Sequence, residues 1–157
     1  MSHPSQTLQN TEATLHAVIE VLIDGQEVLQ QIGEDLKHEP AKRRLLAESL
    51  KRAEFRGELE TLLHQEGVHD IKESGTAEGT VYRIWAEVKG KLGGGDSTLL
   101  ATAEQTEEAA RDIYAKSLMS EPSLPFPIRQ LLSSQAVQIA KSSAYIKATR
   151  DEISQAP

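Results

Sequence analysis

Apolar residues recur at alternating steps of three and four along most of the chain, which predicts long amphipathic helices. The first stripe, within residues 11–37, consists of Leu15, Val18, Leu22, Leu29, Ile32 and Leu36. Similar stripes predict long helices at about 40–66, 97–119 and 127–153, and a shorter one at about 76–92. No stretch alternates with the period of two that a half-buried strand shows. The pattern therefore predicts an all-α protein.

The breaks between the stripes carry residues that start and stop helices. Pro40 suits the first turn of a helix, and Gly67 suits a left-handed helix end. A glycine run, 93–95, precedes the fourth long stripe, and three prolines within 122–127 precede the last one. The repeats lie nearer 3.5 than 3.6 residues, as in left-handed bundles. We therefore predict a ferritin-like four-helix bundle, made of two antiparallel hairpins joined by a crossover helix at 76–92.

Length and composition fit one domain. The chain has 157 residues, of which 38% are hydrophobic. A chain of this length and composition can bury one sizeable core. We predict a single helical-bundle domain at 11–157. Residues 1–10 lack periodicity, and we expect them to form a disordered tail.

The charges exclude several classes of function. The net charge is −7 and acids and bases are interspersed, which argues against a nucleic-acid-binding surface. Cysteine is absent, so disulfides, thiol catalysis and zinc-thiolate sites are excluded. The N-terminus lacks the features of a secretory signal, and charges interrupt every apolar segment. We expect a cytoplasmic protein that does not enter membranes.

The predicted helix 97–119 has an unusual face, because acids occupy positions where a plain core has aliphatic residues. This face alternates apolar with ionic residues and consists of Leu100, Glu104, Glu107, Arg111, Tyr114 and Leu118. Two charges one helical turn apart, Glu48 and Arg52, lie on the apolar stripe of the helix 40–66, and polar Gln135 lies on that of the last helix.

These positions predict a structural polar core, which consists of Glu48, Arg52, Glu104, Glu107, Arg111, Tyr114 and Gln135. We expect Arg111 and Arg52 to hold Glu104 and Glu107 in the ionised form. Such pairing lowers the pKa of a carboxyl group.

A metal site is the alternative use of these carboxylates. A ferritin-like dinuclear iron or manganese site needs a Glu-x-x-His pair from each of two helices. Residues 66–69 hold such a pair, but it crosses the helix end at Gly67. We therefore expect no metal or other cofactor. If a metal binds, its candidate ligands are Glu20, Glu27, Glu58, Glu104 and Glu107.

No arrangement of serine and histidine indicates nucleophilic catalysis on this scaffold. Two classes of function stay open: a non-catalytic helical protein that binds itself or a protein partner, and a dimetal oxidase or peroxide-handling bundle.

One packing detail is also predicted. Gly25 interrupts the first apolar stripe, so we expect a bulky side chain, Trp85 or Tyr114, to lie against it.

Several segments together resemble a bacterial ferritin-like four-helix-bundle family of unknown function. They are LIDGQE at 22–27, KRAEFRGELETLL at 51–63, the helix around Trp85, GGGD at 93–96 and AEQTEEAARDIYAKSL at 103–118. The resemblance implies the fold, a bacterial cytoplasmic setting and an association with stress or storage physiology. Relatives have histidine near the positions of Tyr82 and Ser143, and this chain does not, which weakens an inherited metal site.

Overall fold

The computed structural model describes residues 4–67, 95–120 and 124–155. These residues form four helices and no strand, namely α1 (Pro4–Asp35), α2 (Glu39–Gln65), α4 (Gly95–Ser120) and α5 (Phe126–Gln155). The predicted all-α fold is confirmed. None of the described helices is both long enough and apolar enough to span a membrane.

Three of the helices have both ends within two residues of the predicted bounds, whereas the first is longer. α1 begins at Pro4, so the disordered tail predicted for residues 1–10 is wrong from residue 4 onward. The crossover helix predicted at 76–92 lies outside the described residues.

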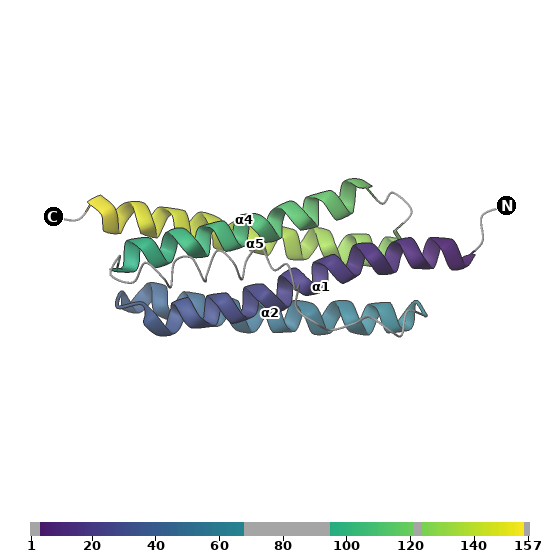
Figure 1. Ribbon diagram of the computed structural model, residues 1–157, viewed down its shortest axis with the longest axis horizontal. Helices are drawn as coiled ribbons and strands as arrows, with labels where there is room; N and C mark the ends of the chain where they lie inside the picture. The colour runs from purple at the N-terminus through teal and green to yellow at the C-terminus, as the bar shows by residue number, and fades with distance from the viewer. Residues whose placement is uncertain (1–3, 68–94, 121–123, 156–157) are drawn as a thin grey trace.

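The helices pack as two antiparallel pairs, α1 with α2 and α4 with α5, and α1 also contacts α4 while α2 contacts α5 (Figure 1). The start of α4 lies beside the end of α1, because the carboxylate of Asp96 accepts from the backbone N–H groups of Lys37 (2.9 Å) and His38 (2.8 Å). The end of α2 lies beside the start of α5, where Gln65 and Pro127 line one groove. The end of α2 and the start of α4 therefore lie at opposite ends of the bundle.

Local chemistry explains where α2 begins and ends. The His38 side chain accepts from the backbone N–H of Ala41 at 3.2 Å. It thereby caps the first turn, which contains Pro40. Gly67 follows the last turn with a φ of 90°, a left-handed value that glycine adopts without a steric penalty. The predicted start and stop signals of this helix thus act as expected.

The four helices enclose a continuous core of aliphatic side chains. Its largest fully buried aliphatic members are Leu15, Ile19, Leu22, Leu29, Ile32, Leu45, Leu59, Leu63, Leu100 and Ile128. Charged and amide side chains interrupt this core mainly where α2, α4 and α5 meet. These polar positions therefore stand out as the candidate site.

Gly25 does not lie against Tyr114. A Cβ atom added to this buried glycine would meet no described atom within 4 Å, so that alternative is wrong, and Trp85 lies outside the described residues. The close approach occurs instead at Gly33. An added Cβ there would lie 2.9 Å from Leu46 Cγ and 3.3 Å from the backbone nitrogen of Leu46.

We expect Gly33→Ala to destabilise the protein relative to Gly57→Ala by about 1–3 kcal/mol, the usual cost of overpacking. Both changes gain similar helix propensity, about 1 kcal/mol. Gly57, however, is exposed in mid-helix and its added Cβ would meet no described atom within 4 Å. Urea denaturation of the two variants measures the difference. Equal stabilisation by both would show that α1 and α2 do not approach closely at Gly33.

Candidate functional site

A buried ionic cluster joins α2 to α4, and we use this name for Glu48, Arg52 and Glu107. Arg52 donates from Nη1 to Oε2 of Glu48 at 3.3 Å, and from Nη2 to Oε2 of Glu107. All three residues are at most 1% exposed. The Arg52 guanidinium also lies 5.4 Å from the centre of the Phe55 ring. This distance is within the range of a cation–π contact.

The two carboxylates of the cluster differ in their access to further cations. Oε1 of Glu48 lies 3.1 Å from Arg44 Nε and 3.5 Å from Lys51 Nζ, both on partly exposed side chains. Arg44 is held in turn by the Tyr145 ring of α5, 4.5 Å away. Among the described residues, Arg52 is the only cation that pairs with Glu107. Glu48 is therefore compensated from the surface, and Glu107 depends on Arg52.

Burial raises the pKa of Glu107 above its ordinary value. This effect outweighs the opposing charge of Arg52 and the Ser142 hydroxyl, and the nearby Glu48 carboxylate raises the pKa further. The predicted lowering of the Glu107 pKa is therefore wrong, because desolvation exceeds the attraction of one shared guanidinium.

Nε of Arg52 is buried without a hydrogen-bond partner among the described residues. Oε1 of Glu107 and the nearby Ser142 hydroxyl are buried without a hydrogen bond of good geometry. Since an unsatisfied buried polar atom costs about 1–3 kcal/mol, the cluster is an expensive part of the core.

A second polar layer lies further along the bundle and connects α4, α5 and α2. The Tyr114 hydroxyl donates to Oε1 of Gln135 at 2.7 Å. Nε2 of Gln135 donates to the backbone carbonyl of Phe55 at 3.1 Å and lies 3.4 Å from Oε1 of Glu58. Burial raises the pKa of Tyr114, so its phenol stays neutral and acts as the donor. The buried hydroxyl of Tyr114 and the amide of Gln135 therefore have hydrogen-bond partners within this layer.

Glu104 and Arg111 do not lie as predicted. Oε2 of Glu104 lies 2.9 Å from Nη1 of Arg150 on α5, and Arg111 is exposed on the outer side of α4. The prediction that Arg111 holds Glu104 and Glu107 is therefore wrong. The antiparallel register of α4 and α5, in which Ser97 and Ser154 also lie 3.1 Å apart, brings Arg150 beside Glu104.

The candidate metal ligands are dispersed. Glu20 pairs with His16 at 2.9 Å on α1, and Glu27 is exposed on the same helix. Glu58 is exposed at the edge of a groove, while Glu104 and Glu107 pair with arginines. Within residues 4–67, 95–120 and 124–155, no three histidine or acidic side chains lie close enough together to bind one metal ion.

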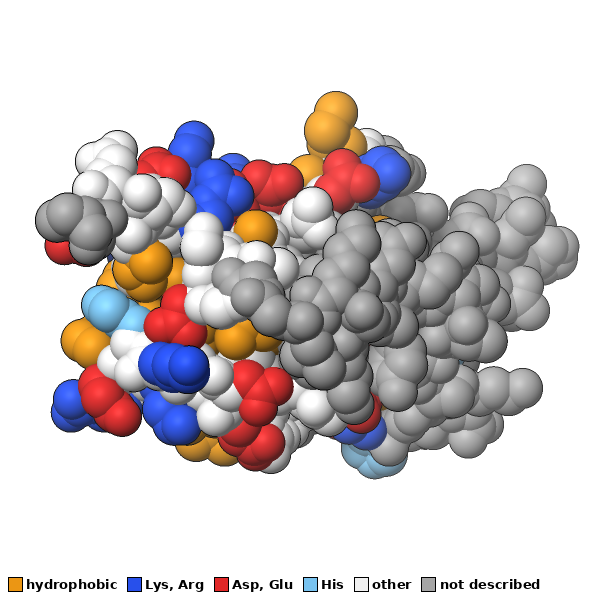
Figure 2. Space-filling model, turned by 60° about the vertical axis from the view of Figure 1, so that its left-hand side comes forward, with side chains coloured by type: hydrophobic (Ala, Val, Ile, Leu, Met, Phe, Trp, Pro, Cys, Tyr) orange, Lys and Arg blue, Asp and Glu red, His pale blue; other side chains and the backbone are white. Residues whose placement is uncertain are grey.

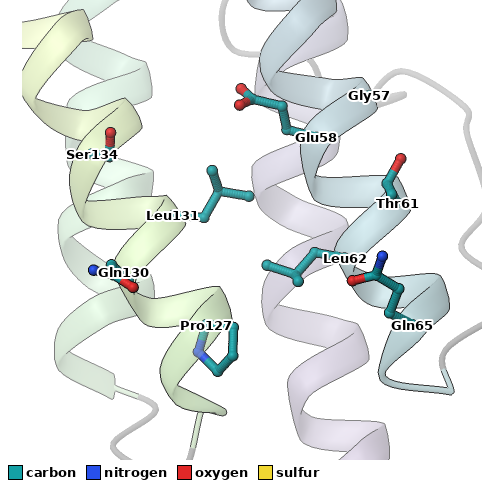
Figure 3. Close-up of a pocket in the computed structure, with 9 residues that line it drawn as sticks. All are labelled: Gly57, Glu58, Thr61, Leu62, Gln65, Pro127, Gln130, Leu131 and Ser134. Carbon is teal, nitrogen blue, oxygen red and sulfur yellow. The ribbon is translucent and has the colours of Figure 1, made fainter.

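An open groove of about 730 Å³ runs between the last turns of α2 and the first turns of α5. Its lining consists of Gly57, Glu58, Thr61, Leu62, Gln65, Pro127, Gln130, Leu131 and Ser134. Leu62 and Leu131 extend toward each other across it, and Glu58 lies at one end (Figure 3). The lining combines an apolar floor with one carboxylate, from Glu58, and the hydroxyl groups of Thr61 and Ser134.

A family model matches residues 10–120, which include all of α2 and α4 and most of α1. Its description is domain of unknown function (DUF2383). The chain belongs to this family. The ionic cluster lies inside the matched DUF2383 segment, whereas the contacts from α5, made by Gln135, Ser142 and Arg150, lie beyond it. No curated protein and no solved structure matches the chain.

Proposed function

We propose that this chain is a non-catalytic, soluble helical-bundle protein of the bacterial cytoplasm, whose polar core fixes how its helices pack and whose surface binds a second copy or a protein partner. The observation that carries this proposal is the ionic cluster. Its arginine pairs with one oxygen of each of the two buried carboxylates, which a metal or a substrate would have to displace.

The burial of the cluster supports a structural role. A general acid or base must come within hydrogen-bonding reach of its substrate, and Glu107 is fully buried. Buried ion pairs rarely add stability over a well-packed apolar core, but they can select one packing arrangement. Arg52 pairs with both α2 and α4, so one relative placement of these helices satisfies it.

The connectivity supports a ferritin-like affiliation as part of this proposal. The end of α2 and the start of α4 lie at opposite ends of the bundle, as on either side of the long connection of a ferritin-like fold. The resemblance noted in the sequence adds a role in stress or storage physiology to the proposal.

The proposal includes no nucleic-acid partner, and the distribution of surface charges supports this. On the face in Figure 2, the described acidic and basic side chains are interspersed. A nucleic-acid interface instead concentrates basic side chains on one face.

We expect protein purified without a histidine tag to contain no stoichiometric iron, manganese or zinc, and its melting temperature to rise little with added Fe²⁺ or Mn²⁺. A metal that binds only the folded state would raise that temperature by mass action. Elemental analysis and thermal unfolding with each metal alone measure both quantities.

Stoichiometric metal with a large thermal shift would contradict the proposal and favour the dimetal oxidase or peroxide-handling alternative. In that case Glu107→Gln should abolish binding. Glu34→Gln is the matched control, because Glu34 is an exposed acid outside the candidate ligands.

A further inference from the structure

The outward face of α2 carries a stripe of exposed residues whose charge changes sign along the helix. Arg43, Ala47, Leu50, Glu54 and Gly57 follow steps of four, three, four and three, so they share one face. We call these five residues the outer stripe. All are exposed, on the side of α2 opposite the core positions Leu45, Phe55 and Leu59.

Leu50 lies at the middle of the outer stripe and is 67% exposed. The other large exposed hydrophobic side chains of the described residues are Met119, Phe126 and Val137, which lie on α4 and α5. Leu50 therefore places one apolar side chain at the centre of a stripe whose two ends carry opposite charges.

The charges of the outer stripe are available for pairing. Arg43 and Glu54 make no ion pair with any described residue. Glu58, next to Gly57, is contacted through one oxygen by the Gln135 amide, at the edge of the groove in Figure 3. The first half of the stripe is thus basic and the second half acidic.

We propose that the outer stripe is a self-association surface, on which α2 of a second copy packs antiparallel across a two-fold axis near Leu50. An isologous contact of this kind places residue i opposite residue j and j opposite i. With Leu50 opposite Leu50, Arg43 of each copy lies opposite Gly57 of the other copy.

That register satisfies both charges at once. Gly57 has no side chain, and no described atom lies within 4 Å of its Cβ position, which leaves room for a long arginine. The flanking acids Glu54 and Glu58 then lie within reach of the Arg43 guanidinium. The contact repeats by symmetry, so the interface holds two such charge contacts on either side of one apolar centre.

A second groove formed by described residues lacks this complementarity. It runs between α4 and α5, and its charged lining residues Glu108, Arg111 and Asp112 mix both signs within two turns. Such a mixed pattern of charges does not favour one register of a second copy over another. The outer stripe separates its signs by about three turns of helix, and only the antiparallel orientation brings opposite signs together.

Reciprocal charge reversal tests the proposal in the full-length protein. Arg43→Glu should be monomeric by sedimentation, and so should Glu54→Lys/Glu58→Lys, because each then places like charges opposite one another. An equimolar mixture of these two proteins should recover the dimer, since both contacts become complementary. Glu108→Lys, an exposed reversal in the other groove, should leave the dimer unchanged.

The absence of native cysteine allows a second, independent measurement. Leu50→Cys should form a covalent dimer under mild oxidation, because the two-fold axis brings the two thiols together. Val137→Cys, at a site that is 54% exposed, should not. Circular dichroism confirms that each variant remains helical.

A wild-type chain that sediments as a monomer at all concentrations, or a dimer that survives both charge reversals, would overturn the proposal. Equal cross-linking at Leu50→Cys and Val137→Cys would also overturn it. The inference rests on the proposed role, in which the protein surface binds a second copy or a partner. The experiments distinguish the two proposals, because bound metal refutes that role, whereas a metal-free monomer refutes only the dimer.

Discussion

Arg52→Met should lower the free energy of unfolding by about 3–5 kcal/mol, the cost of leaving buried charges without their partner. The change removes the hydrogen-bond donor of Oε2 in both Glu48 and Glu107. Glu48 keeps Arg44 and Lys51, but Glu107 keeps no cation among the described residues. Most of the loss should therefore come from Glu107.

Urea denaturation at neutral pH measures this loss, and Arg111→Met provides the matched control. Arg111 is exposed on α4. Its replacement should therefore change stability by no more than about 0.5 kcal/mol, as is usual for surface substitutions. A large loss in Arg111→Met would support the additional pairing with Arg111 that the sequence predicted, and no loss in Arg52→Met would show that Arg52 does not compensate Glu107.

The joint variant Glu48→Leu/Arg52→Met/Glu107→Leu separates stability from specificity. Replacing all three charges by apolar residues leaves none stranded, so it should regain most or all of the stability lost in Arg52→Met. If the cluster selects one packing arrangement, the joint variant should show broadened methyl resonances. Sharp, dispersed resonances would indicate that the cluster does not determine packing.

The error in α4 shows what a helical stripe cannot reveal. The stripe of larger side chains, which predicts the buried face, runs through Glu104 and Arg111. The buried stripe of α4 instead runs through Ala103, Glu107, Ala110, Tyr114 and Ser117, of which three are small. Small residues allow two helices to approach closely, but they contribute little to the hydrophobic pattern of the sequence. Glu107 and Tyr114 were placed correctly inside because they belong to both stripes.

The interhelical partners were harder to predict than the buried positions. Glu48 and Arg52 share one helix, so their spacing determines that they can meet. Arg150 and Ser142 contact α4 only because the α4–α5 register and the rotation of both helices bring them there. Those quantities depend on packing across the whole pair, which a single stripe does not encode.

The start of α1 illustrates a different limit. Residues 4–10 lack an apolar stripe, yet they continue the helix. Extending an existing helix adds one hydrogen bond for each residue fixed, whereas starting one is costly. A helix can therefore continue beyond its buried segment, and hydrophobic periodicity marks the packed part rather than the helix end.

Glu107→Gln should become progressively more stable relative to the wild type as the pH rises. Burial raises the folded pKa of Glu107 above the unfolded value of about 4.3, so the folded state binds this proton more tightly. The stability contributed by Glu107 is therefore fully present below the unfolded pKa and is lost as the pH rises through the folded pKa. Glutamine is neutral throughout and does not share this loss.

Urea denaturation of the wild type and Glu107→Gln across a pH series measures the difference between them. The informative quantity is the slope of this stability difference with pH. The difference at any single pH also contains the effect of replacing the carboxylate on the hydrogen bond from Arg52. Glu108→Gln, at the exposed neighbouring position, is the matched control. If the wild type instead gains stability over Glu107→Gln as the pH rises, attraction to Arg52 exceeds desolvation. The folded pKa of Glu107 would then lie below the unfolded value.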